Sequence, residues 1–427
     1  MYNHIPPVLL EHANILTSYC EKNFPSLASL AKPCFLSTIA TTVQSLDEKH
    51  TFVITGDIPA MWLRDSAAQV TNYIPFAKKD AKLRKLLEGV IQTQAECVCI
   101  DPYANAFNAS ANGNGAKDIT LQNDMVWERK YEVDSLCAPI YLAHQYWKET
   151  GYITAFSAEF HTALQKIVSV FTYEQDHSRS PYLFERLNCA LTDTLSNHGK
   201  GSPVKPTGMT WSGFRPSDDR CEYGYLVPAN MMACVALEKA SEICMAVYND
   251  SILSDQCLAL KKAINIGIQE YAIISHPKYG NIYAYETDGM GHYNLMDDAN
   301  SPSLLSIPYF GYCNSDEEIY QNTRRFILSA DNPYFYQGKF ASGIGSPHTE
   351  AGYVWPIAII LQALTSQSTK EILHCLTMLA NTHSGTNQMH ESFDPDVPEH
   401  YSRPWFAWAN TLFASLLEKL FTSDFKV

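Results

Sequence analysis

The sequence predicts an all-α fold, an (α/α)6 barrel with long loops and minor β content at the barrel mouth. Apolar residues recur at spacings of three and four, and each such segment ends in a cluster of Gly, Pro, Asn or Asp. Several long connections separate these segments. No low-complexity tract, Ser/Gly linker or charge block marks a domain boundary. We therefore expect a single domain over residues 1–427.

The amphipathic segments divide most of the chain into predicted helices. Residues 131–150 show the pattern, because apolar side chains share one stripe and Gly151 follows as a C-terminal stop. Helices arranged in antiparallel pairs suit an (α/α)6 barrel, and an α-solenoid would give a similar number of helices. The predicted helices cover residues 8–20, 25–46, 62–76, 79–101, 131–150, 155–178, 228–248, 251–273, 315–329, 352–366, 368–382 and 403–421.

Four connections, at residues 102–130, 179–227, 274–314 and 383–402, are longer than ordinary loops. They are rich in aromatic, carboxylate and amide side chains, and long loops of this kind commonly carry function. The segment 280–289 contains strand-forming residues followed by an Asp-Gly turn signal. It predicts a short β-hairpin.

Composition excludes several functions. The formal net charge of −14 opposes binding to nucleic acid, because phosphate backbones are held by surplus Lys and Arg. No run approaches the roughly 18 consecutive apolar residues of a membrane span. Met1 to Leu30 lacks the basic segment of a signal peptide, which predicts a cytoplasmic protein without a membrane partner. The sequence does not indicate an oligomeric partner.

The cysteines and the acidic residues predict no metal and no cofactor. The 12 cysteines form no C-x-x-C pair, so the spacing of a structural zinc site is missing and we expect free, mostly buried thiols. Met290 to Asp298 contains one His and two carboxylates, too few hard ligands to favour a metal site. Nucleotide-binding and serine-nucleophile motifs are also absent.

The densest polar cluster is Trp211 to Arg220, just before a predicted helix. Asp218 and Asp219 are adjacent, and Arg215 lies nearby. Burial and a like charge raise the pKa of a carboxyl group, whereas arginines lower it, so one of the two acids could be held protonated. The same residues are typical of a turn or a helix cap.

A second cluster runs from Gly385 to Pro395, ahead of Arg403 and the final helix. His390 and Asn387 flank Glu391 and could position its carboxylate to take a proton from water. An ordinary exposed loop has the same composition.

Three smaller groups suit sugar binding. Trp62, Arg64 and Asp65 combine a flat aromatic face with partners for vicinal hydroxyls. Tyr131 and Asp134 share one face at a helix start, where Asp134 could equally compensate the helix dipole. His348 precedes another helix. Together these loops favour carbohydrate chemistry over nucleotide or acyl chemistry.

Several of these segments recur together in one known family. They are Gly56–Ser66, Trp127–Leu136, Phe214–Asp219, Gly345–Thr349 and Asn387–Phe393. In this order they resemble the motifs of glycoside hydrolase family 125, and the similarity runs from about residue 25 to the C-terminus. The resemblance implies an (α/α)6 barrel and metal-independent, exo-acting hydrolysis of terminal α-1,6-linked mannose with inversion. The expected partner is then an α-mannosidic oligosaccharide or glycan.

Carried onto this chain, the resemblance makes Asp218 the general acid and Glu391 the general base, with Asp219 as the position most easily confused with Asp218. Two alternatives remain: a sugar epimerase or isomerase that uses His348 and His390, and a glycan-binding protein without catalysis. The residues expected to hold the sugar are Trp62, Arg64, Asp65, Tyr131, Asp134, Arg215, Asp219, His348, Asn387, His390 and Arg403.

Overall fold

The structure is a computed structural model that describes residues 5–423 and 425, so both ends of the predicted domain (1–4, 424 and 426–427) lie outside the described residues. The chain is mostly helical, and each predicted helical range contains a helix. The short α7 lies outside those ranges. The helices are α1 Pro7–Asn23, α2 Ala28–Thr41, α3 Leu63–Val70, α4 Ala81–Ile100, α5 Val133–Thr150, α6 Ala158–Tyr173, α7 Ser196–Gly199, α8 Val227–Ile243, α9 Ser251–Tyr271, α10 Glu318–Ile327, α11 Pro356–Thr365, α12 Thr369–Asn381 and α13 Ala407–Thr422.

The short strands pair in small antiparallel sheets, of which the three-stranded ones have the orders β3-β4-β5 and β10-β9-β6. The predicted hairpin at 280–289 is divided between two hairpins: β8 pairs with β7 before it, and β9 pairs with β10 across the Asp-Gly turn. The strands are β1 Val43–Ser45, β2 Thr51–Val53, β3 Met61–Trp62, β4 Ala106–Phe107, β5 Val126–Glu128, β6 Tyr225–Leu226, β7 Ile273–His276, β8 Gly280–Tyr283, β9 Glu286–Thr287, β10 Tyr293–Asn294, β11 Phe335–Gln337 and β12 Ser342–Ile344.

Some predicted helices were too long, for identifiable reasons. The range 62–76 contains α3 followed by a 3-10 turn, Thr71–Phe76, which includes Pro75. The range 403–421 starts too early, because Pro404 keeps the residue before it out of helical conformation and α13 begins only at Ala407. In contrast, α5 ends as predicted, with Gly151 in the left-handed conformation at φ 76°.

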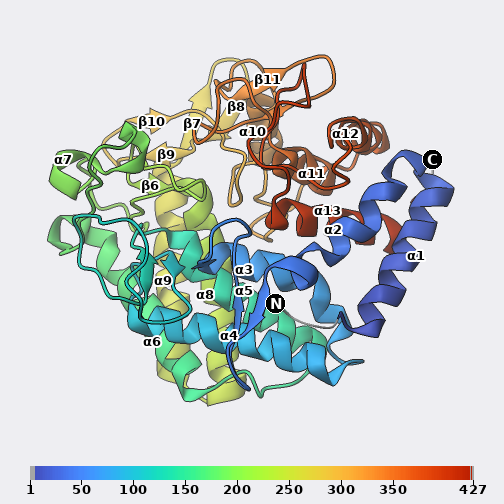
Figure 1. Cartoon of the computed structure of the whole chain (residues 1–427). Coiled ribbons are helices and arrows are strands. Elements are labelled where there is room, and N and C mark those ends of the chain that lie inside the picture. Colours follow the sequence, from blue (N-terminus) through green and yellow to red (C-terminus); the bar gives the residue numbers. More distant parts are fainter. Residues whose placement is uncertain (1–4, 424, 426–427) are drawn as a thin grey trace.

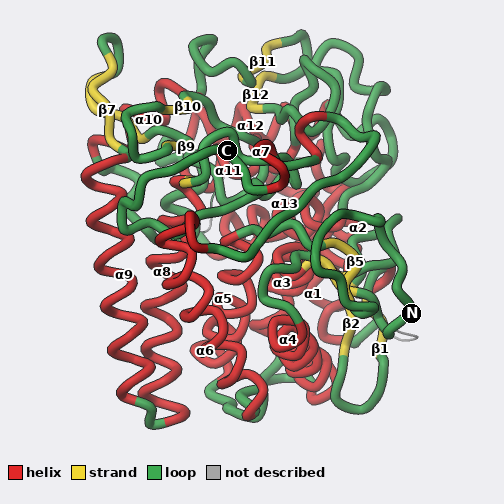
Figure 2. The backbone as a smooth tube through the Cα atoms, turned by 90° about the vertical axis from the view of Figure 1, so that its left-hand side faces the viewer, coloured by secondary structure: helices red, strands yellow, loops and turns green. Residues whose placement is uncertain are grey.

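Helices that follow one another in sequence pack side by side, as α1 does with α2, α8 with α9, and α11 with α12. A second set of contacts joins α11 to α13, α13 to α3, α3 to α5, and α5 to α8. Figure 1 shows these helices packed against one another in one body. In Figure 2 most long loops and short strands gather above the bundle.

Most of the core is one contiguous cluster of buried apolar side chains that extends from Leu9 to Leu420, and a small separate cluster contains Ala60, Trp62 and Ala106. All 12 cysteines are free and most are buried, as the sequence predicts. Among the residues that the structure describes, no helix has both the length and the apolar character needed to cross a membrane.

Asn410, on α13, is a buried polar tie between α13, α2 and the loop before Met389. Its Oδ1 accepts hydrogen bonds from Met389 N at 2.8 Å and Cys34 Sγ at 3.2 Å. Its Nδ2 donates to Ser37 Oγ at 3.0 Å and Gln388 Oε1 at 2.8 Å. Every polar group in this cluster is therefore satisfied inside the core, and losing the amide would leave several unpaired.

We predict that Asn410→Ala lowers the free energy of unfolding by about 2–3 kcal/mol, since buried partners lose their hydrogen bonds. Urea denaturation followed by circular dichroism measures the change. The matched control is Thr377→Ala, whose hydroxyl bonds only Leu373 O on an exposed helix face; it should stay within about 0.5 kcal/mol of wild type. Equal losses for both variants would contradict this account of the core.

Candidate active site

A cavity opens where the N-terminal ends of α3, α11 and α13 meet the long loops. We call it the active-site cavity. Helix N-termini carry a partial positive charge, so this end of the fold favours acidic side chains. Its walls contain carboxylates, cationic groups and aromatic rings. The lining residues are Thr55, Ile58, Trp62, Arg64, Asp65, Pro216, Ser217, Asp218, Asn300, His348, Trp355, Glu391, Arg403, Phe406 and Trp408.

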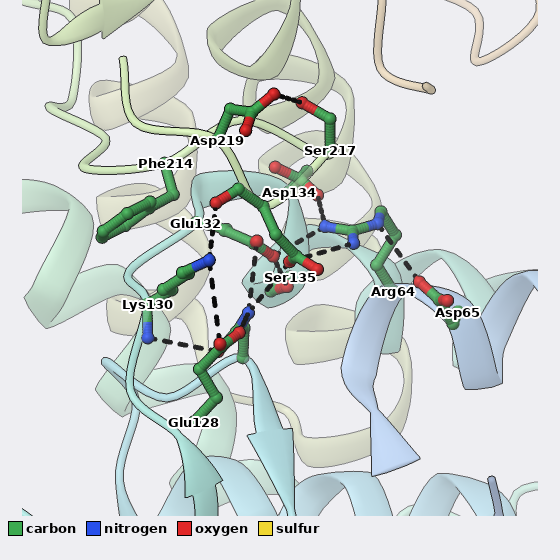
Figure 3. Close-up of polar contacts among 12 residues, drawn as sticks. Arg64, Asp65, Glu128, Lys130, Glu132, Asp134, Ser135, Phe214, Ser217 and Asp219 are labelled. Atoms are coloured by element: carbon green, nitrogen blue, oxygen red, sulfur yellow. Dashed lines mark hydrogen bonds and ion pairs between the residues drawn. The ribbon is translucent and has the colours of Figure 1, made fainter. Parts of the chain in front are cut away.

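Arg64 lines this cavity and is buried among carboxylates (Figure 3). Its Nη1 donates to Glu132 Oε2 at 2.6 Å and to Asp134 Oδ2 at 3.0 Å. Its Nε lies 3.3 Å from Asp65 Oδ1, and its Nη2 lies 3.9 Å from Asp218 Oδ1. Because α3 packs against α5, the first turns of both helices contribute to one charged cluster.

The backbone places Asp218 and Asp219 differently. Asp218 has a φ of 67°, in the left-handed region, and Lys130 Nζ donates to its carbonyl oxygen at 2.8 Å. The Asp218 side chain is 25% exposed and lines the cavity, whereas that of Asp219 is only 3% exposed and lies behind the wall. Asp219 accepts a hydrogen bond from Ser217 Oγ at 3.5 Å. Of the two acids, Asp218 is the one open to a ligand.

Asp218 and the buried Glu132 lie together, because both face Arg64 and both accept from the Asn105 amide. Burial raises the pKa of Glu132 well above its ordinary value, and the nearby carboxylates add to this effect, although Arg64 opposes it. For Asp218 burial also raises the pKa, but the charges of Lys130 and Arg64 hold it below its ordinary value. These opposite directions favour the protonated form of Glu132 and the ionised form of Asp218.

Glu391 faces the same cavity from the loop that precedes α13. Its Oε2 accepts from Ser402 Oγ at 2.7 Å, and its Oε1 lies 3.5 Å from Arg403 Nη1. His390, beside it, is buried, stacks on Tyr401 with ring centroids 4.0 Å apart and contacts Arg403 O through Nδ1 at 3.0 Å. The imidazole of His390 thus fixes the loop that carries Glu391.

His348 supplies a positive charge to the cavity. Its Nδ1 lies 3.6 Å from Asp219 Oδ1. Burial lowers its pKa, but the hydrogen bond and charge of Asp219, with the charges of Asp218 and Glu391, raise it to about 9. Asp298 connects this loop to that of Asp218, because it accepts from both Ser217 Oγ at 2.9 Å and Ser346 Oγ at 3.1 Å.

Aromatic rings form the remaining walls. Trp62 is buried, and its Nε1 is a buried donor with no hydrogen-bond partner within the described structure. Trp408 lies under the guanidinium of Arg64, 5.6 Å from the ring centroid. Flat faces and unpaired donors together suit a sugar ring, which presents C–H surfaces and hydroxyls. In the described part of the chain, no group of three or more His, Cys, Asp or Glu side chains is placed to hold a metal ion.

The structure brings part of the predicted set together. Asp218, Glu391, Trp62, Arg64, Asp65, His348 and Arg403 line the cavity. Asp134, Asp219 and His390 do not line the cavity, but they contact the lining residues Arg64, His348 and Arg403, respectively. Arg215 is buried in an ion pair with Glu286 at 2.6 Å, and Tyr131 is buried against the ring of Trp211. The carbonyl of Asn387 faces the thiol of Cys34, and its side chain is not part of the lining.

Sequence reasoning missed other residues of the site. Asn300, Trp355, Phe406 and Trp408 line the cavity, Glu132 accepts a hydrogen bond from Arg64, and Lys130 donates to the carbonyl oxygen of Asp218. A partial signal existed for two of them, since Trp355 and Phe406 lie near the starts of predicted apolar helices; in the structure they immediately precede α11 and α13, whose N-termini converge here. Asn300 carried no such signal in the sequence, because only the folded chain brings its loop to the cavity.

Comparison with known sequences decides the family. Residues 25–418 match the profile of glycoside hydrolase family 125, described as metal-independent α-mannosidase. The chain belongs to this family. It is therefore a glycoside hydrolase of the α-mannosidase type, and the resemblance inferred from the five motifs is confirmed.

Individual relatives agree. A metal-independent α-mannosidase of Streptococcus pneumoniae, solved as a non-productive complex with α-1,6-mannobiose, is 45% identical, with a TM-score of 0.95 over 99% of each chain. The meiotically up-regulated gene 157 protein of Schizosaccharomyces pombe is 41% identical over 92% of this chain and 81% of its own length. A glucoamylase from Saccharomycopsis fibuligera shares only the fold, at 10% identity and a TM-score of 0.57 over 98% of this chain and 96% of its own.

His348 makes a prediction about stability and pH. A histidine whose pKa rises on folding adds stability below its unfolded pKa of 6.5 and loses that contribution as pH rises through about 9. We predict that the difference in free energy of unfolding between wild type and His348→Gln shrinks from pH 6.5 to pH 9. Urea titrations across this range measure it. The exposed His292 is the control, and a parallel shift in His292→Gln, or no shift in His348→Gln, would contradict the assignment.

Proposed function

We propose that the protein is an inverting exo-α-mannosidase that removes terminal α-1,6-linked mannose, with Asp218 as general acid and Glu391 as general base. Asp218 protonates the glycosidic oxygen as the C1–O bond breaks. Glu391 takes a proton from a water molecule that attacks C1 from the opposite face of the ring. Inverting enzymes need two carboxyl groups with room for this water between them.

The observation that carries the proposal is that Asp218 and Glu391 come from different loops and line one cavity. Their surroundings differ as the two roles require. Asp218 lies beside the buried Glu132, with which it shares the Asn105 amide, whereas Glu391 accepts from Ser402 Oγ and has Arg403 3.5 Å away.

The substrate class follows from the family and from the neighbouring structure. The Streptococcus pneumoniae relative was solved with α-1,6-mannobiose, and its 45% identity over 99% of this chain supports the same linkage here. We propose that His348, Arg403 and Trp62 hold the terminal mannose. Arg64 and Trp408, which also line the cavity, would then close it beyond that sugar, as an exo mode requires.

For the fold, we propose that the helix pairs form an (α/α)6 barrel. The inner helices would then include α3, α5, α8, α11 and α13, which contact one another in succession. The glucoamylase match over 98% of the chain supports the same arrangement. An epimerase with two central histidines fits less well, because His390 is buried against Tyr401 and does not line the cavity.

Incubation with α-1,6-mannobiose, followed by proton NMR within the first turnovers, tests the reaction. We expect β-mannose as the first product, because attack opposite to the leaving group inverts an α-linkage. Initial release of α-mannose would contradict the inverting mechanism. Absence of hydrolysis would contradict the substrate.

Variants of the two acids provide the controls for this experiment. Asp218→Asn and Glu391→Gln should each lower kcat by about 10²–10⁴-fold, the usual contribution of a general acid or base. Asp219→Asn removes a neighbouring carboxylate of the same size behind the cavity wall, and we expect a loss of about tenfold or less. A larger loss for Asp219→Asn than for Asp218→Asn would show that Asp219, and not Asp218, is the general acid.

A further inference from the structure

Glu132 lies directly behind Asp218 at the start of α5, and its side chain is fully buried. Its Oε2 accepts from Arg64 Nη1 at 2.6 Å and Ser135 Oγ at 2.7 Å. Its Oε1 lies 3.2 Å from Asn105 Nδ2, an amide that also reaches Asp218 Oδ1 at 3.3 Å. The Glu132 and Asp218 carboxyl groups therefore meet at one amide, that of Asn105, and both face the guanidinium of Arg64.

The charges around this pair favour a proton on one of the two carboxyls. Arg64 faces both of them and also Asp65 and Asp134, whereas Lys130 binds only the carbonyl oxygen of Asp218. Like charges at close range in a buried site disfavour full ionisation. The charged and titratable groups that face the pair are Arg64 and Asp65 from α3, Glu128 and Lys130 from the segment before α5, Asp134 from α5, Cys221 after the Asp218 loop, and His348 across the cavity.

We propose that Glu132 stores the proton that Asp218 delivers to the glycosidic oxygen. The inference rests on the proposed role of Asp218 as the acid. It explains how a carboxyl group kept ionised in the free protein can act as an acid: its proton is held on the neighbouring carboxyl group. Only the Asp218 side chain opens into the cavity, so the substrate meets the pair through Asp218 alone.

The proton movements balance. The proton passes from Glu132 to Asp218, and the carboxylate left on Glu132 is stabilised by the hydrogen bonds from Arg64, Ser135 and Asn105. Asp218 then gives the proton to the glycosidic oxygen while the C1–O electron pair goes to the leaving sugar. Glu391 takes a proton from the attacking water and releases it to solvent. A proton from solvent restores the pair.

The experiment compares Glu132→Gln with Asp134→Asn on two substrates, α-1,6-mannobiose and α-mannosyl fluoride, over a range of pH. Fluoride leaves with little help from an acid, so its hydrolysis reports the base and the binding site only. Asp134 contacts the same Arg64 nitrogen at 3.0 Å, which makes it a matched control for changes in charge around the guanidinium.

We expect Glu132→Gln to lose about 100-fold in kcat on the disaccharide at pH 7 but less than about fivefold on the fluoride. The basic limb of its disaccharide pH profile should move to lower pH by about one unit or more, because Asp218 then titrates without its partner. Glu132→Asp, which keeps a titratable group, should restore the position of the limb. Asp134→Asn should affect both substrates equally and leave the limb in place.

Equal losses of Glu132→Gln on both substrates with an unmoved basic limb would show that Glu132 is only structural, and would overturn the inference while the mannosidase stands. Wild-type protein that hydrolyses neither substrate would overturn both proposals. If Glu132→Gln does not fold, difference infrared spectroscopy of wild type against Asp218→Asn decides. A protonated carboxyl band that shifts when Asp218 is replaced supports a shared proton, and an unchanged band rejects it.

Discussion

The buried guanidinium of Arg64 is the contact on which the rest of the site depends. It sits among Asp65, Glu132, Asp134 and Asp218, which come from two helices and a loop far apart in the sequence. Without a cation, so many acids could not be buried together, because removing one partner of a buried ion pair leaves a charge uncompensated. Arg64 therefore lines the cavity and also compensates the charge of the acids that are buried around it.

Around Arg64, the loops are held in place by side-chain hydrogen bonds and a ring stack rather than by helices or sheets. Asp298 joins the loops of Ser217 and Ser346, and Ser402 and His390 hold the loop of Glu391. Each tie is a buried hydrogen bond or a stacked ring, which constrains a loop without a sheet or helix. The two carboxylates assigned to catalysis thus face one cavity although neither lies within a helix or strand.

Periodicity predicted the helices well because their apolar stripes are long and end in clear stop residues, as α5 does at Gly151. The loops were predicted only as polar segments of functional composition. The choice between Asp218 and Asp219 depends on one left-handed backbone conformation, at φ 67°, which no local pattern specifies. Glu132 was overlooked as a functional group for a similar reason: its neighbours, Arg64 and Asp218, are brought to it only by the packed fold. The sequence motifs identified the segments of the site, but the contacts among those segments could be described only from the folded structure.

The most direct test of this account is a crystal structure of the Glu391→Gln variant with α-1,6-mannobiose bound across the cleavage point. The account predicts that a carboxyl oxygen of Asp218 lies within hydrogen-bond distance of the glycosidic oxygen. It also predicts that the amide of residue 391 contacts a water molecule on the opposite face of the terminal mannose. A complex in which Asp219, or another acid, contacts the glycosidic oxygen while Asp218 stays bound to the protein alone would contradict it.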